Sequence, residues 1–327
     1  LIVRWVTKDR EPHFARLAST EGITHTTFLE YCEVDVIDVD PSSDLGAIYE
    51  SLHSDPMVEA VEVDGEMRIQ EVPNDPSWQS LWGIEKIDAL AARTFLRPTG
   101  SLLQRPIVSV IDTGVDYDHP DLTEQMWTNP GEIPGNGIDD DGNGYVDDVY
   151  GYDFHNDDGD PSDDNGHGTH SAGTIGAVQN ISLEVSGVAP AVRIMALKVF
   201  GSDGTGWTSN AALALNYALS FEVSISSNSY GTEARSPVEE AAIGAALAQG
   251  HLVVTAAGNT ASDNDESPRY PCAFEFDNVI CVASTNSEDT LSNFSNFGVN
   301  SVDVAAPGSN ILSTVPENSY ANRSGTS

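Results

Sequence analysis

The sequence predicts an α/β protein whose main domain is a doubly wound, mostly parallel sheet with helices on both faces, preceded by a small α+β domain of ferredoxin-like type. From residue 106 onward, short apolar runs alternate with helical segments, which is typical of parallel strands buried on both faces. Before residue 72, two strand–helix–strand patterns follow one another. With 327 residues, the chain is long enough for one large core and a smaller unit.

The small domain is predicted from its apolar periodicity. Alternating valines in 34–39 and 58–63 indicate strands, and apolar residues spaced as on one helix face indicate a helix over 44–54. A segment rich in turn residues, 72–77, follows, so we place the domain boundary after residue 71. The expected elements, in order, are a strand over 1–6, a helix over 12–20, strands over 23–32 and 34–39, a helix over 44–54 and a strand over 58–70.

The main domain, 72–327, is predicted from its apolar runs. In doubly wound sheets, binding sites lie at the carboxyl ends of strands, and Asp112 and Asn259 both follow the ends of such runs. The expected strands are 107–111, 192–199, 223–227, 252–257 and 279–283, and the expected helices are 168–178, 208–220 and 237–249.

The charge balance is strongly acidic. Fourteen basic and 51 acidic residues give a net charge of −37, which repels nucleic acid and anionic lipid and favours divalent cations. Residues 106–192 contain no Lys or Arg, so the acidic stretch 139–164 needs a cation or full hydration. No apolar run is long enough for a membrane span. We therefore expect no nucleic-acid partner and no membrane insertion.

The chain starts at Leu1 with neither an initiator Met nor the layout of a signal peptide. We expect a fragment whose targeting segment is missing, from a secreted or extracellular protein. Asn180, Asn293 and Asn322 each begin an N-glycosylation triplet, a pattern that is common by chance. Such glycosylation would agree with secretion.

Three cysteines are present, two of them close together in the sequence. Cys272 and Cys281 are nine positions apart, whereas Cys32 lies in the small domain. A disulfide between Cys272 and Cys281 is the prediction, and two buried thiols are the alternative.

Three short motifs supply the groups of a nucleophilic site. Asp112 lies in Val-Ile-Asp-Thr-Gly, His167 in Gly-His-Gly-Thr-His, and Ser327 in Gly-Thr-Ser, in that order. A serine hydroxyl needs an imidazole to accept its proton and a carboxylate to orient the imidazole. Each motif alone is weak, since Asp-Thr-Gly also occurs in aspartic proteases.

Together with the blocks at 119–122, 167–174, 187–190 and 256–259, these motifs resemble the subtilases, the subtilisin-like serine proteases, over about 250 residues. The resemblance implies a serine endopeptidase that works through an acyl-enzyme. Asp112, His167 and Ser327 would form the triad, and Asn259 would donate to the oxyanion together with the backbone amide of Ser327. His170 is then structural.

The resemblance also implies a substrate cleft, with a pocket for the side chain before the scissile bond and an edge to which an extended peptide adds as a strand. Arg269 aligns with the deep end of that pocket. If Arg269 points inward, an acidic residue before the cut is favoured; if it points outward, it is a surface charge. The pocket residues are Ser229, Tyr230, Gly231, Ala256, Ala257 and Gly258, and the edge residues are Gly204, Thr205 and Gly206.

Residues 139–150 match the first half of a calcium loop. Asp139, Asp141 and Asn143 occupy its first, third and fifth positions, and Tyr145 would contribute a backbone carbonyl. The twelfth position lacks the usual Glu, so we expect one of two later carboxylates, Asp147 or Asp148, to complete the shell. The alternative is a hydrated acidic turn.

Two further calcium sites follow from the resemblance. One would use Asp153, Asp158 and Asp160, ahead of the triad histidine. The other would pair Asp121 with Asn180, although an insertion over 181–186 departs from the usual loop length. In all, one to three structural calcium ions are expected.

Residues 1–71 look like the inhibitory prosegment of the family, the alternative being an independent ferredoxin-like module. We expect a monomer that acts on proteins or peptides, is inhibited by its own prosegment, and cleaves itself between Gln70 and Asn74. A helix should follow Ser327, and we expect the chain that ends there to show no turnover. The competing functions are a peptide-binding pseudoprotease or stable precursor, and a calcium-binding adhesion module.

Overall fold

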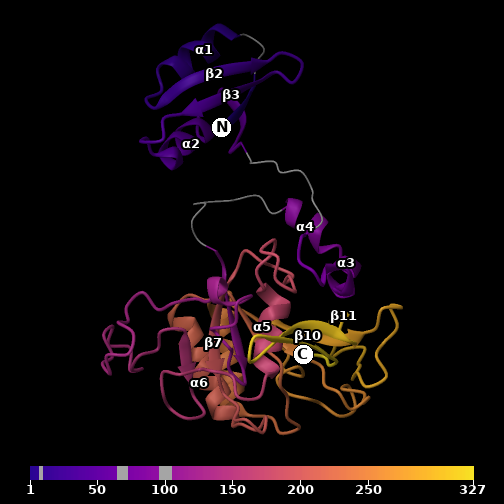
Figure 1. The fold of residues 1–327 in the computed structure, drawn as a ribbon. Helices are drawn as coiled ribbons and strands as arrows, with labels where there is room; N and C mark the ends of the chain where they lie inside the picture. Colours follow the sequence, from indigo (N-terminus) through magenta and orange to yellow (C-terminus); the bar gives the residue numbers. More distant parts are fainter. Residues whose placement is uncertain (7–9, 65–72, 96–104) are drawn as a thin grey trace. The chain divides into compact units, whose positions relative to one another are not determined.

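The computed structural model describes residues 1–6, 10–64, 73–95 and 105–327. The chain divides into two compact units, Leu1–Glu71 and Val72–Ser327, at the residue where the sequence analysis places the domain boundary. Figure 1 shows the elements of each unit, which we describe separately.

The first unit is a four-stranded antiparallel sheet in the order β2-β3-β1-β4 with two helices. This is the predicted split βαβ arrangement. Helix α2 begins after Asp44, whose carboxylate accepts a hydrogen bond from the backbone of Ala47. The last strand ends at Glu62, and residues 65–70 of the predicted strand lie outside the described residues. The elements are β1 (Ile2–Trp5), α1 (Arg10–Ala18), β2 (Ile23–Leu29), β3 (Val34–Val39), α2 (Leu45–His53) and β4 (Val58–Glu62).

The second unit contains a seven-stranded parallel sheet in the order β11-β10-β9-β8-β5-β7-β6. Strand β5 is the first strand of this sheet in the sequence. The next two, β6 and β7, lie on one side of β5, and the chain then crosses to β8 on the other side. The strand order therefore reverses beside β5, where doubly wound sheets bind their ligands. The strands are β5 (Ile107–Asp112), β6 (Gly151–Asp153), β7 (Arg193–Lys198), β8 (Ile225–Asn228), β9 (Leu252–Ala256), β10 (Val279–Thr285) and β11 (Val304–Pro307).

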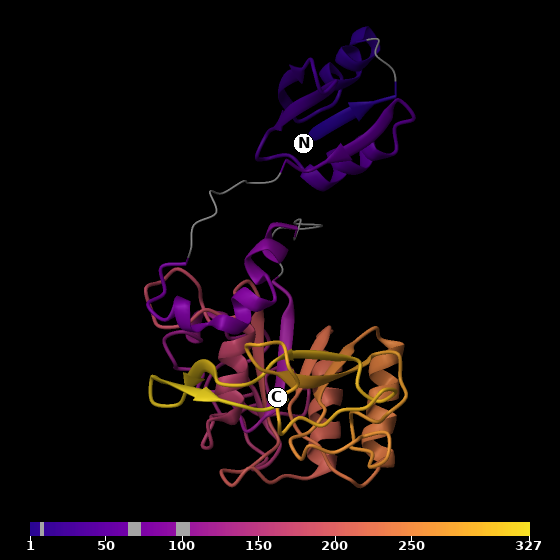
Figure 2. The ribbon, with the colours of Figure 1, turned by 90° about the vertical axis from the view of Figure 1, so that its right-hand side faces the viewer.

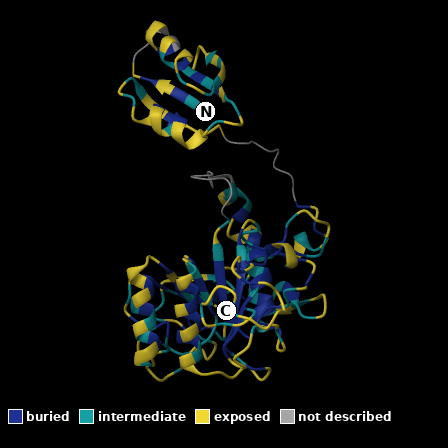
Figure 3. Ribbon diagram, turned by 90° about the vertical axis from the view of Figure 1, so that its left-hand side faces the viewer, coloured by how far each residue is buried: buried dark blue, intermediate teal, exposed yellow. Residues whose placement is uncertain are grey.

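Helices cover both faces of this sheet (Figures 1 and 2). Val108 and Val110 of β5 pack with Ala172 of α5 (His167–Gly176), whereas Ile111 belongs to a separate core. That core includes Leu215 of α6 (Thr208–Ser220) and residues of α7 (Pro237–Ala248). Alternate strand residues thus face opposite layers, as expected for a doubly wound sheet. Figure 3 shows that the outer surfaces of the helices are exposed.

Several short elements were not predicted. Strand β6 has three residues inside the acidic stretch, and no apolar periodicity marks it. The hairpin β12–β13 packs with α5 rather than joining the main sheet. None of the helices in the described parts of the chain has the length and apolarity that a membrane crossing requires. The other unpredicted elements are η1 (Trp78–Ser80), α3 (Trp82–Lys86), α4 (Ala89–Phe95), η2 (Thr123–Gln125), β11 (Val304–Pro307), β12 (Ile311–Val315) and β13 (Ser319–Arg323).

Candidate active site

The structure brings the three motif residues into one hydrogen-bonded row. Asp112 is the last residue of β5, and His167 is the first residue of α5. The Nδ1 atom of His167 lies 2.7 and 2.9 Å from the two carboxylate oxygens of Asp112. On the other side of the ring, Nε2 lies 3.2 Å from the Oγ atom of Ser327. A carboxylate, an imidazole and a hydroxyl thus lie in the order that activates a nucleophile.

Burial and charge act in opposite directions on His167. Burial alone would lower its pKa, but the hydrogen bond and negative charge of Asp112 outweigh burial, so the pKa is raised. Asp112 is only 2% exposed and also accepts a hydrogen bond from the backbone of Thr113. The carboxylate is therefore held in place, and it favours the imidazolium form of His167.

Asp163 joins the segments that carry Asp112 and His167. One carboxylate oxygen accepts from the Thr113 hydroxyl at 2.8 Å, and the other accepts from the backbone and hydroxyl of Thr169 in the first turn of α5. This residue was not predicted from the sequence. An acidic residue just before a predicted helix start is the signal that could have found it.

Lys198, the last residue of β7, is buried beside the same segment. Its Nζ atom donates to the carbonyl of Thr113 at 2.7 Å and to the carboxylate of Asp164 at 2.6 Å. Its side chain is 2% exposed, which is rare for lysine unless the charge is paired. This contact holds the chain immediately after Asp112.

The side-chain amide of Asn259 is oriented by Thr326. Its Oδ1 atom accepts from the backbone and hydroxyl of Thr326, at 2.9 and 3.0 Å. The Thr326 hydroxyl in turn accepts from the backbone of Gly258. Because its oxygen is engaged in this way, the NH2 group of Asn259 is left to donate beside Ser327.

The predicted cleft residues lie in loops at the carboxyl ends of strands. Gly204, Thr205 and Gly206 are exposed between β7 and α6, and residue 206 bridges Phe200 in antiparallel register. A Cβ atom on Gly206 would lie 2.3 Å from the carbonyl oxygen of Val199, so a glycine is required there. Ser229, Tyr230 and Gly231 follow β8, whereas Ala256, Ala257 and Gly258 are at or beyond the end of β9.

Arg269 forms an ion pair with Glu233 at 3.1 Å. The Glu233 side chain is 80% exposed, whereas that of Arg269 is 25% exposed. A guanidinium paired to an exposed carboxylate fits the outward alternative better than a free cation deep in the pocket. The structure therefore gives no support for an acidic preference before the cut.

The predicted calcium loop brings two of its expected ligands together with a third residue. Carboxylate oxygens of Asp139, Asp141 and Glu132 lie within 4.8 Å of one another, in the only such cluster of three found among the described residues. Glu132 was missed because it precedes the motif. Asp147 and Asp148 do not belong to this cluster, so the residue that would complete the shell stays a prediction.

The carboxylates of Asp147 and Asp148 accept hydrogen bonds from other residues. Asp147 accepts from the backbone of 136 and 137. Asp148 is buried and accepts from Asn129, Asn143 and Tyr217. Burial raises the pKa of Asp148, although these hydrogen bonds partly offset the effect. Tyr145 packs against aromatic neighbours, including Tyr217.

The structure does not gather Asp153, Asp158 and Asp160 into a cluster within the described residues. Asp153 is buried and accepts from the backbone of His155 and both nitrogens of Asn156. Asp160 accepts from Tyr117. The second calcium site therefore stays a prediction.

Asp121 is buried beside the 180–185 loop. One oxygen accepts from Tyr320 at 2.8 Å and from the backbone of Val185, whereas the other is buried and has no hydrogen-bond partner. One oxygen of Asp75 is also buried without a partner, and its other oxygen accepts from the backbone of Asn180. Burial raises the pKa of Asp121, and the charge of Asp75 adds to this effect. Two unsatisfied carboxylate oxygens here suit a cation.

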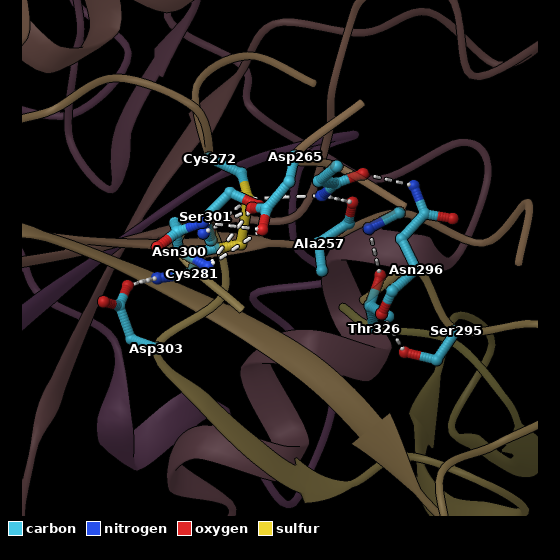
Figure 4. The surroundings of a disulfide bond; sticks show 12 residues. Ala257, Asp265, Cys272, Cys281, Ser295, Asn296, Asn300, Ser301, Asp303 and Thr326 are labelled. Atoms are coloured by element: carbon cyan, nitrogen blue, oxygen red, sulfur yellow. Dashed lines mark hydrogen bonds between the residues drawn. A yellow bond between two sulfur atoms is a disulfide. The ribbon is translucent and has the colours of Figure 1, made fainter. Parts of the chain in front are cut away.

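The predicted disulfide is present. Cys272 and Cys281 are bonded, and Figure 4 shows the residues around this bond. Cys32 is free and exposed. The glycosylation candidates Asn180, Asn293 and Asn322 are all exposed, as a modified asparagine must be.

Comparisons with known proteins agree with this geometry. The sequence profile of the Subtilase family matches residues 104–327. Thermitase from Thermoactinomyces vulgaris is 36% identical over 256 residues, covering 78% of this chain and 80% of thermitase. The thermophilic serine proteinase of Bacillus sp. (strain AK1) is 34% identical, covering 86% of this chain and 62% of that protein. A solved structure of a cold adapted subtilisin-like serine proteinase aligns with a TM-score of 0.56 and 30% identity, covering 75% of this chain and 78% of that one.

A parallel sheet with a carboxylate, an imidazole and a hydroxyl at its switch point defines the class of serine hydrolases with a subtilisin-like fold. The chain belongs to the subtilase family. Its activity is that of a serine endopeptidase, and its substrates are proteins or peptides.

Proposed function

We propose that Ser327 is the nucleophile with which the full-length protein cleaves peptide bonds. The His167 Nε2 atom accepts the Ser327 proton as Oγ attacks the carbonyl carbon, and then gives that proton to the leaving amine. Water attacks the resulting ester by the same route in reverse and releases the acid and the free serine. Asp112 keeps the imidazole in the tautomer that presents Nε2, and Asn259 donates to the developing oxyanion together with the Ser327 amide.

The row from Asp112 through His167 to Ser327 carries this proposal. A fluorophosphonate probe applied to the full-length protein should label Ser327 and abolish hydrolysis. The Ser327→Ala variant should neither be labelled nor turn over substrate. A pseudoprotease would bind peptides but remain unlabelled, and labelling of a different serine would refute the assignment.

We propose structural calcium at two places. Asp121 and Asp75 would use their unsatisfied buried oxygens, together with the 180–185 loop, and Asp139, Asp141 and Glu132 would hold a second ion through carboxylate oxygens. Calcium there neutralises clustered carboxylates and crosslinks loops. Calorimetric titration of chelator-treated protein should show binding that Asp121→Asn and Asp139→Asn each reduce by one site. Unchanged stoichiometry in a variant would refute the corresponding site.

We propose that residues 1–71 are a prosegment that inhibits the second unit, and that the protein is secreted as a monomer. The antiparallel sheet of this unit and the following turn-rich link support a removable domain. The expected cleavage, between Gln70 and Asn74, falls largely on residues outside those described. Sequencing the N-terminus of the active form tests this, and retention of residues 1–71 in fully active enzyme would refute inhibition.

A further inference from the structure

The buried side chain of Asn296 forms several hydrogen bonds to the loop that carries Asn259. Asn296 is 0% exposed and follows β10 by eleven positions. Its Oδ1 atom accepts from the backbone of Thr260 at 2.9 Å, the hydroxyl of Thr260 at 3.0 Å and the backbone of Ser262 at 3.1 Å. Its own backbone N–H donates to the carbonyl of Gly258 at 2.8 Å. Asn296 therefore bonds the residues on both sides of Asn259.

A second buried asparagine, Asn264, extends this contact toward the disulfide. The Asn296 Nδ2 atom donates to Asn264 Oδ1 at 2.9 Å, and Asn264 Nδ2 donates to the carbonyl of Ala257 at 2.9 Å. Asn264 also lies 3.5 Å from the Sγ atom of Cys272. The loop from 257 to 262 is thus bonded at four residues to one asparagine pair.

Asn296 lies so close to the backbone of Gly258 that residue 258 cannot carry a side chain. A Cβ atom there would lie 2.5 Å from Asn296 Nδ2, and the residue has a φ of +112°. The side chain at position 296 must both accept and donate hydrogen bonds. Its Oδ1 atom faces three donors, whereas its Nδ2 atom faces the side-chain amide oxygen of Asn264. An aspartate would place two acceptors against each other, and an alanine would remove the acceptor for Thr260 and Ser262 and leave the buried Oδ1 atom of Asn264 without this donor.

We infer that Asn296 is the positioning residue of the oxyanion hole: it sets the backbone of the loop from which Asn259 donates. This inference rests on the proposed role of Asn259. An oxyanion donor must be held within about 0.5 Å of its working position, and Asn259 itself is exposed and anchored only through Thr326 in the contacts described above. Loss of the support behind it should weaken transition-state binding more than substrate binding.

The test is a double-mutant cycle in the full-length protein, with rates divided by the concentration of fluorophosphonate-reactive sites. Asn296→Ala should lower kcat by about 10- to 100-fold, with little change in KM. In an Asn259→Ala background, Asn296→Ala should lower kcat by less than about threefold, since the two residues act as a unit. Asn296→Ser, which retains a donor and an acceptor, provides a milder second variant if the alanine variant does not fold, and its loss of kcat should also disappear in that background.

Asn278 supplies the matched control. It is a buried asparagine whose Nδ2 atom donates to backbone carbonyls of Ile243 and His251, away from the triad. Asn278→Ala should lower stability while leaving kcat per active site unchanged. If the Asn296 variants keep normal kcat, or lose the same factor with and without Asn259, the inference is overturned and the triad assignment stands. If Asn259→Ala keeps full kcat, the proposed role of Asn259 fails, and this inference fails with it.

Discussion

Glu239, in the first turn of α7, is a buried carboxyl without a visible purpose in the proposed reaction. It is 2% exposed, and its carboxyl group interacts with Tyr230, which offsets only part of the effect of burial. Burial raises its pKa to about 7. A carboxyl whose folded pKa exceeds its unfolded value binds more protons in the folded state, so its contribution favours folding at low pH and is lost as pH rises toward 7.

We therefore predict that Glu239→Gln changes the pH dependence of stability. Relative to the parent protein, the variant should gain free energy of unfolding between pH 5 and pH 8, on the order of 3 kcal/mol at most. Urea denaturation at several pH values measures this gain. Glu240→Gln is the control, because Glu240 is paired with Arg235 at the surface and its pKa is lowered. A constant difference between Glu239→Gln and parent across this range would contradict the prediction.

Asp112 should set the acid limb of the activity profile. Hydrolysis needs a neutral imidazole, so activity falls as pH drops through the raised pKa of His167. Asp112→Asn removes the charge that raises it, so the acid limb should move to lower pH while kcat falls about 10⁴-fold. The profile of kcat/KM against pH tests both effects. Asp289→Asn, which breaks only an exposed pair with Lys86, should leave the limb where it is.

Among single residues, those that belong to short sequence motifs could be identified as site residues from the sequence. Asp112, His167 and Cys272 fall in that group, and the structure places each with its expected partner. The sequence does not predict residues whose partners come from distant segments. Asn296 bonds a loop more than thirty positions away, and no local pattern distinguishes it from any other asparagine.

At the scale of elements, the strands that carry the site were predictable because each is a buried apolar run. Strand β5 ends at Asp112, one residue beyond the predicted end, and α6 spans its predicted residues. Strands β12 and β13 were missed because they form a separate hairpin whose residues are mostly only partly buried, so apolar alternation is weak. The acidic cluster of Glu132, Asp139 and Asp141 was predicted only in part, since Glu132 comes from the segment before the motif.

The disulfide ties the loop after β9 to β10, and its removal should loosen that edge of the sheet. Replacing Cys272 and Cys281 by serine should lower the free energy of unfolding by about 2–3 kcal/mol, because the bond closes a loop of roughly ten residues. Guanidinium denaturation of the double variant measures this loss. Cys32→Ser should have no effect, since that thiol is free and exposed. An equal loss in both variants would show that the crosslink is not the cause.

Over the whole molecule, the net charge of −37 is a property that no single contact reveals. Carboxylates that outnumber basic groups by this margin repel one another across the surface, and repulsion favours the expanded, unfolded chain. Each pair of like charges about 4 Å apart in water costs about 1 kcal/mol. Salt shortens the range of this repulsion from about 10 Å at 0.1 M to about 3 Å at 1 M.

We therefore predict that the free energy of unfolding rises by several kcal/mol, as an order of magnitude, when NaCl is raised from 0.05 to 1 M in the presence of a chelator. Screening would then act without any bound calcium. A second series at fixed 1 M NaCl, with calcium added in millimolar amounts, separates ion binding from screening, because ionic strength hardly changes. A free energy of unfolding that stays level or falls with NaCl would mean that the folded protein spaces its carboxylates widely enough to avoid repulsion. Stability would then depend on the few sites where carboxylates meet, and Asp121→Asn should abolish the response to calcium at the buried site.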